Sequence, residues 1–333
     1  MKSISQMKFS LYERFTKQGT LSEPDGIPDP LYALPSTIHW IRALSMTVKD
    51  RSTNYESAKS LYSNVQRKSM DVRTENSIFE HLLLGLHQAS ALRALGSAVL
   101  QPDVARVASV AWYYGIYAAA TAMIAAQDGT LQDNHTQTAR SWDRQFSERG
   151  LTMPPFNLRV STCVKKEADL ELDTFRRGRP KTNLVRPPSS MDDAQDYMCG
   201  YLSGTREWWA WRAQEDVRKS SEFKNLNVSN FQTKAARSLR DKRLGGMPIS
   251  FMHQAIRFRG KANYREALYL AHGSSVETQI IDFVSDLSCV LEAFLSMAGA
   301  FSFQRIGESL SNDFLEDVNR YRSFSMKTSD VWA

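Results

Sequence analysis

Twenty consecutive residues without a charged side chain, 107–126 (VASVAWYYGIYAAATAMIAA), constrain the fold of this chain more than any other segment. This length is enough to span a bilayer. The segment is nevertheless rich in alanine and contains Ser109, Thr121 and three tyrosines, so its transfer into lipid is only weakly favourable. A helix that is apolar on all sides is typical of the centre of a helical bundle. We therefore expect a buried core helix and no association with a membrane.

The ends of this central helix are marked in the sequence. Pro102 and Asp103 are typical of a first helical turn, and Asp128-Gly129 is typical of a helix end. Small residues, including Ala111, Gly115 and Ala118, recur along the helix, so neighbouring helices can approach it closely. An earlier helix is expected to begin at Ser77, because Glu80 three residues later gives the spacing of a capping box.

The composition places the chain among ordinary globular proteins and excludes wholesale disorder. The chain has 333 residues, 42% of them hydrophobic and 23% charged, and its net charge of +6 favours an anionic partner. Three unclustered cysteines (Cys163, Cys199 and Cys289) form neither a disulfide framework nor a zinc site, which fits a reducing cytoplasm. We expect no secretory signal, no metal and no cofactor.

Periodicity and proline distribution predict a mostly α fold with two helical bundles. Prolines and glycines indicate an N-terminal segment and loop over residues 1–36, followed by a first bundle over 37–150. Residues 151–195 contain five prolines and a basic stretch, and are interpreted as a linker. A second bundle is expected over 196–333. Residues 157–163 are the best candidate for a short strand.

One segment of the second bundle, residues 257–272 (RFRGKANYREALYLAH), carries the strongest chemical signal. Arg265 and His272 are seven residues apart, so on a helix their side chains lie on one face, two turns apart. This pairs a fixed cation with a group that titrates near neutrality. Three basic residues, Arg257, Arg259 and Lys261, precede the pair and are expected to attract anions.

Two features together resemble HEPN domains. The double-aromatic, alanine-rich segment that begins at Trp112, with His135 shortly after a turn, resembles the central helices of that family. The pair Arg265 and His272 resembles the Arg-x(4–6)-His motif of the family. The resemblance implies a metal-independent endoribonuclease, often a toxin or antiviral effector, that acts as a homodimer with motifs paired across the interface.

If the resemblance holds, His272 acts as a general base on a ribose 2′-hydroxyl or as an acid to the leaving 5′-oxygen. Arg265 stabilises the charge that develops on the phosphorus oxygens through its two-pronged guanidinium. The alternative is structural, because His272 next to Gly273 is also typical of a helix C-terminus.

Two further basic clusters are candidates for contact with nucleic acid. The sequence Arg177-Gly178-Arg179-Pro180 resembles the core of an AT-hook, in which arginines enter the minor groove, and Arg176 and Lys181 would add phosphate contacts. A solvated basic linker is the alternative. The second cluster could bind phosphates or form a solvated face; its residues are Lys234, Arg237 and Arg240, followed by Lys242 and Arg243.

The sequence therefore supports two functional hypotheses, and a helical interaction protein whose positive charge is incidental is the third, plainer alternative. The first is a HEPN-like ribonuclease acting on RNA in stress or phage defence. The second is a non-catalytic subunit of a larger complex that binds DNA through the basic linker. Base stacking on Trp208, Trp209 and Trp211 is a further possibility, with packing in the core as its alternative.

Overall fold

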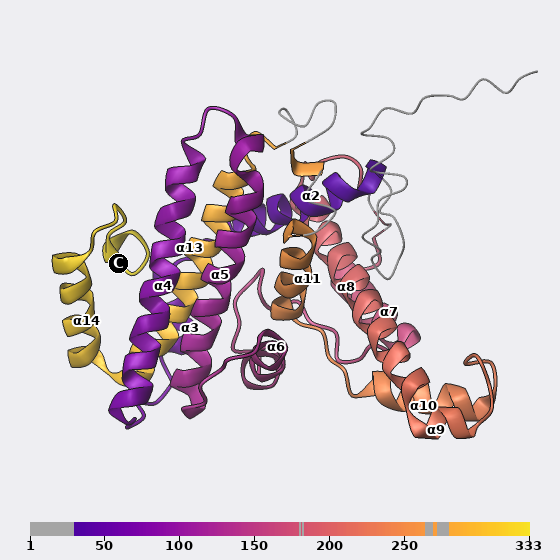
Figure 1. The fold of residues 1–333 in the computed structure, drawn as a ribbon. Helices are drawn as coiled ribbons and strands as arrows, with labels where there is room; N and C mark the ends of the chain where they lie inside the picture. Colours follow the sequence, from indigo (N-terminus) through magenta and orange to yellow (C-terminus); the bar gives the residue numbers. More distant parts are fainter. Residues whose placement is uncertain (1–29, 180, 182, 264–268, 272–279) are drawn as a thin grey trace, which may run out of the picture.

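The computed structural model describes residues 30–179, 181, 183–263, 269–271 and 280–333, which are mostly α-helical (Figure 1). Within these ranges the extended backbone pairing is confined to one isolated antiparallel bridge between Val160 and Ile249. The predicted mostly α class is confirmed, and the strand expected over residues 157–163 contributes only this bridge.

The helices of the described residues follow one another through the whole chain. In order they are α2 (Pro30–Asp50), α3 (Tyr55–Tyr62), α4 (Val72–Gly96), α5 (Gln101–Asp128), α6 (His135–Trp142), the π-helix η1 (Asp143–Ser147), α7 (Lys165–Arg176), α8 (Met191–Lys219), α9 (Ser221–Asn225), α10 (Lys234–Gly245), α11 (Phe251–Asn263), α13 (Phe283–Ile306), α14 (Glu308–Tyr321) and the 3-10 helix η3 (Thr328–Asp330).

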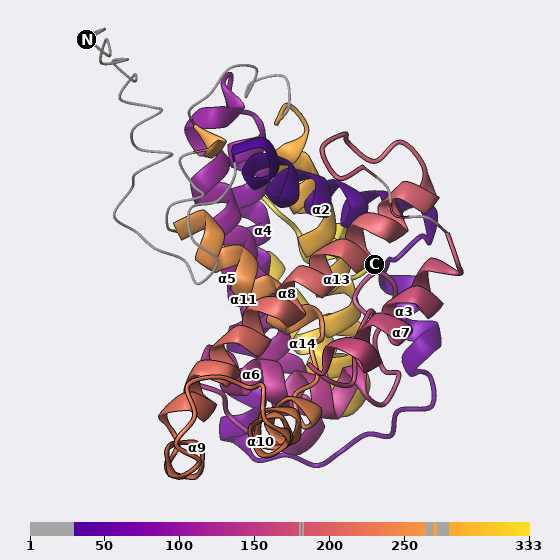
Figure 2. The ribbon, with the colours of Figure 1, turned by 90° about the vertical axis from the view of Figure 1, so that its right-hand side faces the viewer.

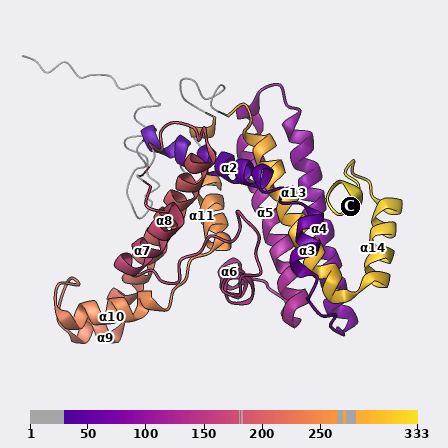
Figure 3. The same ribbon diagram turned by 180° about the vertical axis from the view of Figure 1, so that it is seen from behind.

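Helices α4, α5 and α13 run side by side and form the central layer (Figures 1 and 3). Glycines allow the close approach that the small residues of α5 predict. A Cβ built on Gly115 of α5 would lie 2.6 Å from a methyl group of Leu291 in α13. A Cβ on Gly85 of α4 would lie 2.6 Å from Leu295. Leucines of α13 therefore fill the space left by glycines on both other helices.

A second layer, formed by α2, α8 and α11, packs against the central layer through aromatic rings. Trp40 of α2 stacks on Tyr201 of α8 with ring centroids 4.1 Å apart. Its edge contacts Trp112 of α5, and its ring lies 5.4 Å from that of Phe258 in α11. Trp40, Trp112 and Phe258 are buried, so this cluster fixes the position of α11 between α5 and α8.

The two-bundle arrangement is not confirmed, because the halves of the chain exchange helices. Helix α13 comes from the second half but packs on α3, α4 and α5, whereas α2 comes from the first half and packs on α8. One continuous cluster of buried apolar side chains extends from Leu34 to Trp332. The expected linker contains α7 and the fully buried Phe156, and its Val160 forms the bridge.

Helix boundaries show which local signals were reliable. Helix α5 begins at Gln101, one residue before Pro102, and ends at Gly129, whose φ of 84° is left-handed. Both signals are confirmed. The expected start at Ser77 was wrong, because α4 begins at Val72 with the Asp71 side chain accepting a hydrogen bond from the Thr74 amide at 2.7 Å. The cap at Asp71, six residues before Ser77, therefore determined the start of this helix.

Helices α9 and α10 form a small arm at the end of the molecule opposite to α14 (Figures 1 and 3). The arm has its own apolar cluster, in which Val217, Phe223 and Ala236 are buried. Elsewhere in the described residues, α5 and α13 are long and apolar enough to span a membrane, but most of each apolar stretch is buried against other helices. Such burial is typical of core helices.

Candidate nucleic-acid interface

The predicted catalytic pair is not placed by the structure. Arg265 and His272 lie outside the described residues, as does Pro180 of the AT-hook-like sequence. The nearest described residues before and after Arg265 are Asn263 and Tyr269. Helix α11 ends at Asn263, and Tyr269 and Leu270 are buried in the main core. The interface is therefore built from α11 and the helices that contact it.

Helix α11 presents its three basic residues on two different sides. Arg257 and Lys261 are four residues apart and both lie over the ring of Tyr201 in α8, at 5.6 and 5.8 Å from its centroid. Gly204 of α8 leaves room for the Arg257 guanidinium, which would lie 2.9 Å from a Cβ at that position. Arg259, two residues from Arg257, faces α5 instead. The sequence predicted that the three basic residues act together to attract anions. In the structure they lie on two different faces of α11.

Arg259 lies beside the first of the two features on which the family resemblance rests, the aromatic segment of α5 with His135. Its guanidinium lies over the rings of Tyr113 and Tyr114 in α5, 5.3 and 5.6 Å from their centroids. Tyr113 Oη and His135 Nδ1 form a hydrogen bond of 2.8 Å, and the ring of Tyr117 packs edge-on against His135. We call these five residues the Arg259 cluster. It combines a guanidinium, an imidazole and three aromatic rings. The helices that contribute them, α5, α6 and α11, contact one another, and Figure 2 shows their ribbons.

Local sequence explains how His135 reaches α5. Gly129 ends α5 in a left-handed conformation, and Asn134 caps α6 by accepting hydrogen bonds from the Thr136 and Gln137 amides. The chain therefore turns back between these two residues, and His135 becomes the first residue of α6. Its half-buried imidazole then packs beside the tyrosines in the middle of α5.

The environment of the cluster keeps the imidazole neutral and the phenol protonated. Burial, assisted by the positive charge of Arg259, lowers the pKa of His135 below its ordinary value. Burial raises the pKa of Tyr113, although Arg259 opposes this shift. A neutral imidazole can exchange a proton near pH 7 or accept a hydrogen bond, and it does not cancel the attraction of Arg259 for an anion.

Among the residues that the structure describes, no carboxylate compensates the charge of Arg259. Within the described part of the chain, neither Arg257 nor Arg259 has a carboxylate oxygen within 4.0 Å, and the buried Arg259 Nε has no hydrogen-bond partner. Tyr114 Oη accepts one weak hydrogen bond from Arg259 Nη2 at 3.4 Å. Stacking on tyrosine rings holds a guanidinium without neutralising it. Arg259 is therefore positioned to contact an anion.

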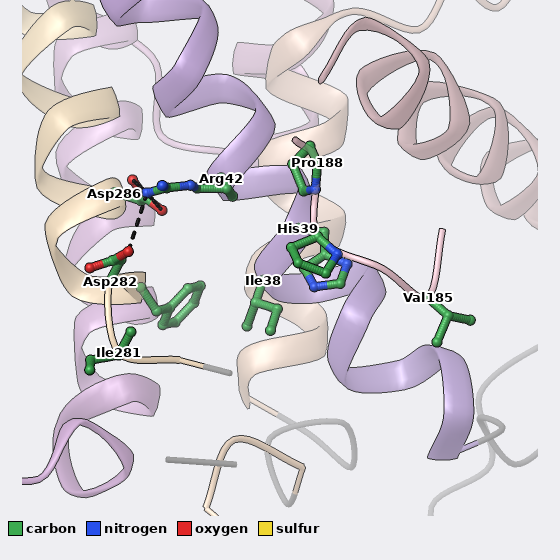
Figure 4. A pocket seen from close by; sticks show the side chains of 10 residues that line it. Ile38, His39, Arg42, Val185, Pro188, Ile281, Asp282 and Asp286 are labelled. Carbon is green, nitrogen blue, oxygen red and sulfur yellow. Dashed lines mark hydrogen bonds and ion pairs between the residues drawn. The ribbon is translucent and has the colours of Figure 1, made fainter. Parts of the chain in front are cut away.

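Arg42 provides the contrast. It lines a hollow of about 460 Å³ between α2, α13 and the 185–188 segment (Figure 4). Its guanidinium donates to both carboxylate oxygens of Asp286 at 3.1 and 3.2 Å, and lies 3.5 Å from Asp282. On the opposite wall, burial lowers the pKa of His39. Because two carboxylates surround Arg42, this hollow has little affinity for a phosphate.

The AT-hook-like segment is folded into the body of the protein. Arg176 is buried and its Nε donates to Asp196 at 2.7 Å, so a carboxylate takes the place of the expected phosphate. Arg177 and Gly178 have left-handed backbones, with φ of 56° and 73°, whereas groove insertion requires an extended path. Arg179 forms an ion pair with Asp192, and Lys181 is exposed.

The end of α8 and the α9–α10 arm together carry most of the excess charge of the chain. Residues 212–243 contain nine basic and four acidic residues, an excess of five charges against six for the whole protein. Lys234 and Arg237 are exposed on α10, as expected. Arg240 is half-buried, donates to Asp241 at 2.8 Å and lies over Phe231, so it contributes less to the open surface.

The remaining candidates are structural. Trp209 is buried against His253, Trp208 packs half-buried on the core, and only Trp211 is exposed. Cys163 and Cys199 are buried, and burial raises the pKa of their thiols to about 12 and about 11. In the described ranges no three or more His, Cys, Asp or Glu residues form a group that could hold a metal ion.

Sequence reasoning used His135 and the tyrosines for the family resemblance but did not treat them as a binding site. The signal was the turn between Gly129 and Asn134, which brings His135 back to the helix that precedes it. The contact with Arg259, more than a hundred residues later, had no signal in the sequence. Comparison with known proteins adds nothing to this geometry: no family model, no curated protein and no solved structure matches the chain.

Proposed function

We propose that the protein is a HEPN-like, metal-independent endoribonuclease that binds single-stranded RNA across the Arg259 cluster. The observation that carries the proposal is the uncompensated guanidinium of Arg259, stacked on Tyr113 and Tyr114 beside the neutral imidazole of His135. Phosphate contacts next to aromatic surfaces are the usual means of binding single-stranded nucleic acid.

The exposed parts of the cluster match the parts of a nucleotide. Tyr114 is 38% exposed and Tyr117 is half-buried, so each has ring surface on which a base can stack. The Arg259 guanidinium would bind the adjoining phosphate. Lys234 and Arg237 on the α9–α10 arm would bind phosphates further along the strand.

Cleavage is assigned to Arg265 and His272, which follow α11 in the chain. In this proposal His272 removes the proton of the ribose 2′-hydroxyl, whose oxygen attacks phosphorus while the bond to the 5′-oxygen breaks. Arg265 stabilises the negative charge on the phosphorus oxygens. A second copy of the protein would supply the paired motif, and the activity would serve a stress or antiviral response, as in the family that the chain resembles.

Cleavage of a labelled single-stranded RNA in EDTA tests the activity. Wild-type protein should cleave. His272→Ala should lose at least about a hundredfold in rate, the contribution of general acid–base catalysis. Arg265→Ala should lose a similar factor, because it removes the stabilisation of the charge on the phosphorus oxygens. His87→Ala, an exposed histidine on α4, is the matched control. Cleavage by His272→Ala at the wild-type rate, or an inert wild-type protein, refutes the ribonuclease proposal.

Binding is tested separately at the Arg259 cluster. Arg259→Ala should weaken binding of single-stranded RNA and reduce the magnitude of its salt slope by about 0.7, the contribution of one phosphate contact on a single strand. Arg42→Ala removes an equal charge that is already neutralised by two carboxylates, and should leave the slope unchanged. Equal slopes for Arg259→Ala and the wild type would exclude the cluster from the interface.

The second candidate function is a non-catalytic nucleic-acid-binding subunit of a larger complex. The observation that favours it is the charge of the α9–α10 arm, because the arm binds by charge alone and needs no catalytic pair. In this alternative the arm contacts duplex DNA in place of the basic linker, because Arg176 of the linker is paired with Asp196. Salt-sensitive duplex binding that is reduced by Lys234→Gln with Arg237→Gln, in a protein inert towards RNA, would support this alternative.

A further inference from the structure

A hollow of about 430 Å³ lies where four segments of the chain meet. They are the end of α2, the turn around Pro154–Pro155, the end of α7 and the beginning of α8. Arginine side chains contribute to its lining from three positions, Arg51, Arg177 and Arg179. The basic segment that resembles an AT-hook in the sequence therefore lines a cavity instead of an open linker.

The lining has an excess of positive charge. Three guanidiniums face one lining carboxylate, that of Asp192, which forms an ion pair with Arg179. Arg51 has a partner outside the lining, because its Nε lies 3.4 Å from Asp50. Arg177 forms no ion pair with a described carboxylate and its side chain is exposed. An anion in the hollow could therefore bind the guanidinium of Arg177, which has no described carboxylate partner. Arg51 and Arg179 each have one such partner and further N–H groups with which to donate.

The backbone of Arg177 gives an independent reason to expect a role for its side chain. Arg177 caps the end of α7 with φ 56° and ψ 39°, a left-handed conformation that side chains other than glycine adopt at an energetic cost. Glycine is the residue usually found at such a position. Strained backbone of this kind gathers at functional sites, where the side chain is needed in that place.

The rest of the lining suits the organic part of a ligand. Pro154, Phe175 and Leu158 provide apolar surface, and the amides of Asn157 and Gln195 provide polar atoms. Pockets for small molecules have volumes of about 300–1,000 Å³. The hollow is therefore large enough for a mononucleotide and much larger than a free phosphate ion.

We propose that this hollow binds a small organic phosphate of nucleotide size, with its phosphate held by Arg177 and Arg179 and its organic part against Phe175 and Pro154. The site is separate from the Arg259 cluster and does not depend on ribonuclease activity.

Calorimetric titration of the full chain at about 0.15 M salt, where exposed charges are screened, tests the site. The probes are AMP, ATP, inorganic triphosphate and adenosine. AMP or ATP should bind more tightly than inorganic triphosphate, and adenosine should not bind. Absence of binding by AMP and ATP up to about 5 mM, a very weak affinity, would overturn the proposal. Binding of adenosine as tight as that of AMP would also overturn it.

Two substitutions of Arg177 separate a binding role from a structural one. Arg177→Gln should weaken nucleotide binding at least about tenfold, the loss expected for a hydrogen bond to a charged group. Arg186→Gln, in the same basic segment but outside the hollow, is the matched control and should bind normally. Arg177→Gly should raise the melting temperature, because glycine relieves the left-handed backbone, and should still weaken binding. Wild-type affinity in both Arg177 variants would refute the site.

Discussion

Replacement of Gly115 by alanine tests the packing of α13 on α5, on which the whole architecture depends. The added Cβ would lie 2.6 and 2.8 Å from the two methyl groups of Leu291, and 3.2 Å from Cβ of Gln88. Ordinary carbon–carbon contacts are about 3.5–4.0 Å, so Leu291 would have to move by roughly 1 Å. Leu291 is fully buried among other side chains and has little room to do so.

Two opposing contributions determine how much Gly115→Ala changes the free energy of unfolding. Overpacking of a well-packed core costs about 1–3 kcal/mol, whereas alanine improves helix propensity over glycine by about 1 kcal/mol. We therefore expect Gly115→Ala to lower the free energy of unfolding by about 0–2 kcal/mol, the difference between the two terms. Gly260→Ala in α11 is the control, because a Cβ there would meet nothing within 4 Å. It should raise the free energy of unfolding by about 0.5–1 kcal/mol.

Urea unfolding followed by circular dichroism and tryptophan fluorescence measures both variants. The two probes should give coincident transitions, because one core extends through the chain. In the double variant with Leu291→Ala, the penalty of the added methyl group should disappear, since its clashing partner is gone. Equal stabilisation by Gly115→Ala and Gly260→Ala would refute the close packing of α5 and α13. Two separate transitions would refute the single core.

Three further changes test other parts of the structure. Burial lowers the pKa of His253 to about 3, so between pH 3 and 6.5 only the unfolded state is protonated, and stability should fall as the pH decreases through this range. His253→Gln should flatten that dependence in acid titrations of unfolding, and the exposed His87→Gln should not. Trp332→Ala should lower the free energy of unfolding by about 3–5 kcal/mol in thermal unfolding, because the buried ring packs against α13 and its Nε1 donates to the Leu295 carbonyl. A loss smaller than about 1 kcal/mol would contradict this packing. Arg176→Ala should cost about 3–5 kcal/mol because it removes one partner of a buried ion pair, whereas Arg177→Ala should change stability little. Equal effects in urea unfolding would argue against a structural role for Arg176.

Helix type and extent were predictable where the signal was local. The uncharged run of α5, with Pro102 near its start and Gly129 at its end, determines a helix whatever it packs against. The start of α4 was missed because a good capping spacing at Ser77 also occurs inside a helix, where its amides already have carbonyl partners. Local patterns identify possible caps, and the extent of the helix decides which one is used.

In the candidate sites, too, the sequence predicted local features, and contacts between distant residues had to be seen in the structure. The basic residues of α11 and their periodicity were visible in the sequence, and the 100° step per residue predicts that Arg259 turns away from Arg257. That Arg259 would lie on tyrosines, whereas Arg42 and Arg176 would be neutralised by aspartates, depends on residues distant in the chain. Basic residues therefore predict an anionic partner only after their carboxylate neighbours are known.

The sequence by itself determined that this protein is helical and that residues 107–126 form a core helix, because these depend on neighbours within a few residues along the chain. Only the tertiary structure decided that α13 joins the first half to the second, that the basic segment after α7 lines a hollow, and that His135 and Arg259 share one cluster. The physical reason is that packing depends on shape and charge complementarity between distant segments. The sequence of one segment does not determine which other segment it will fit.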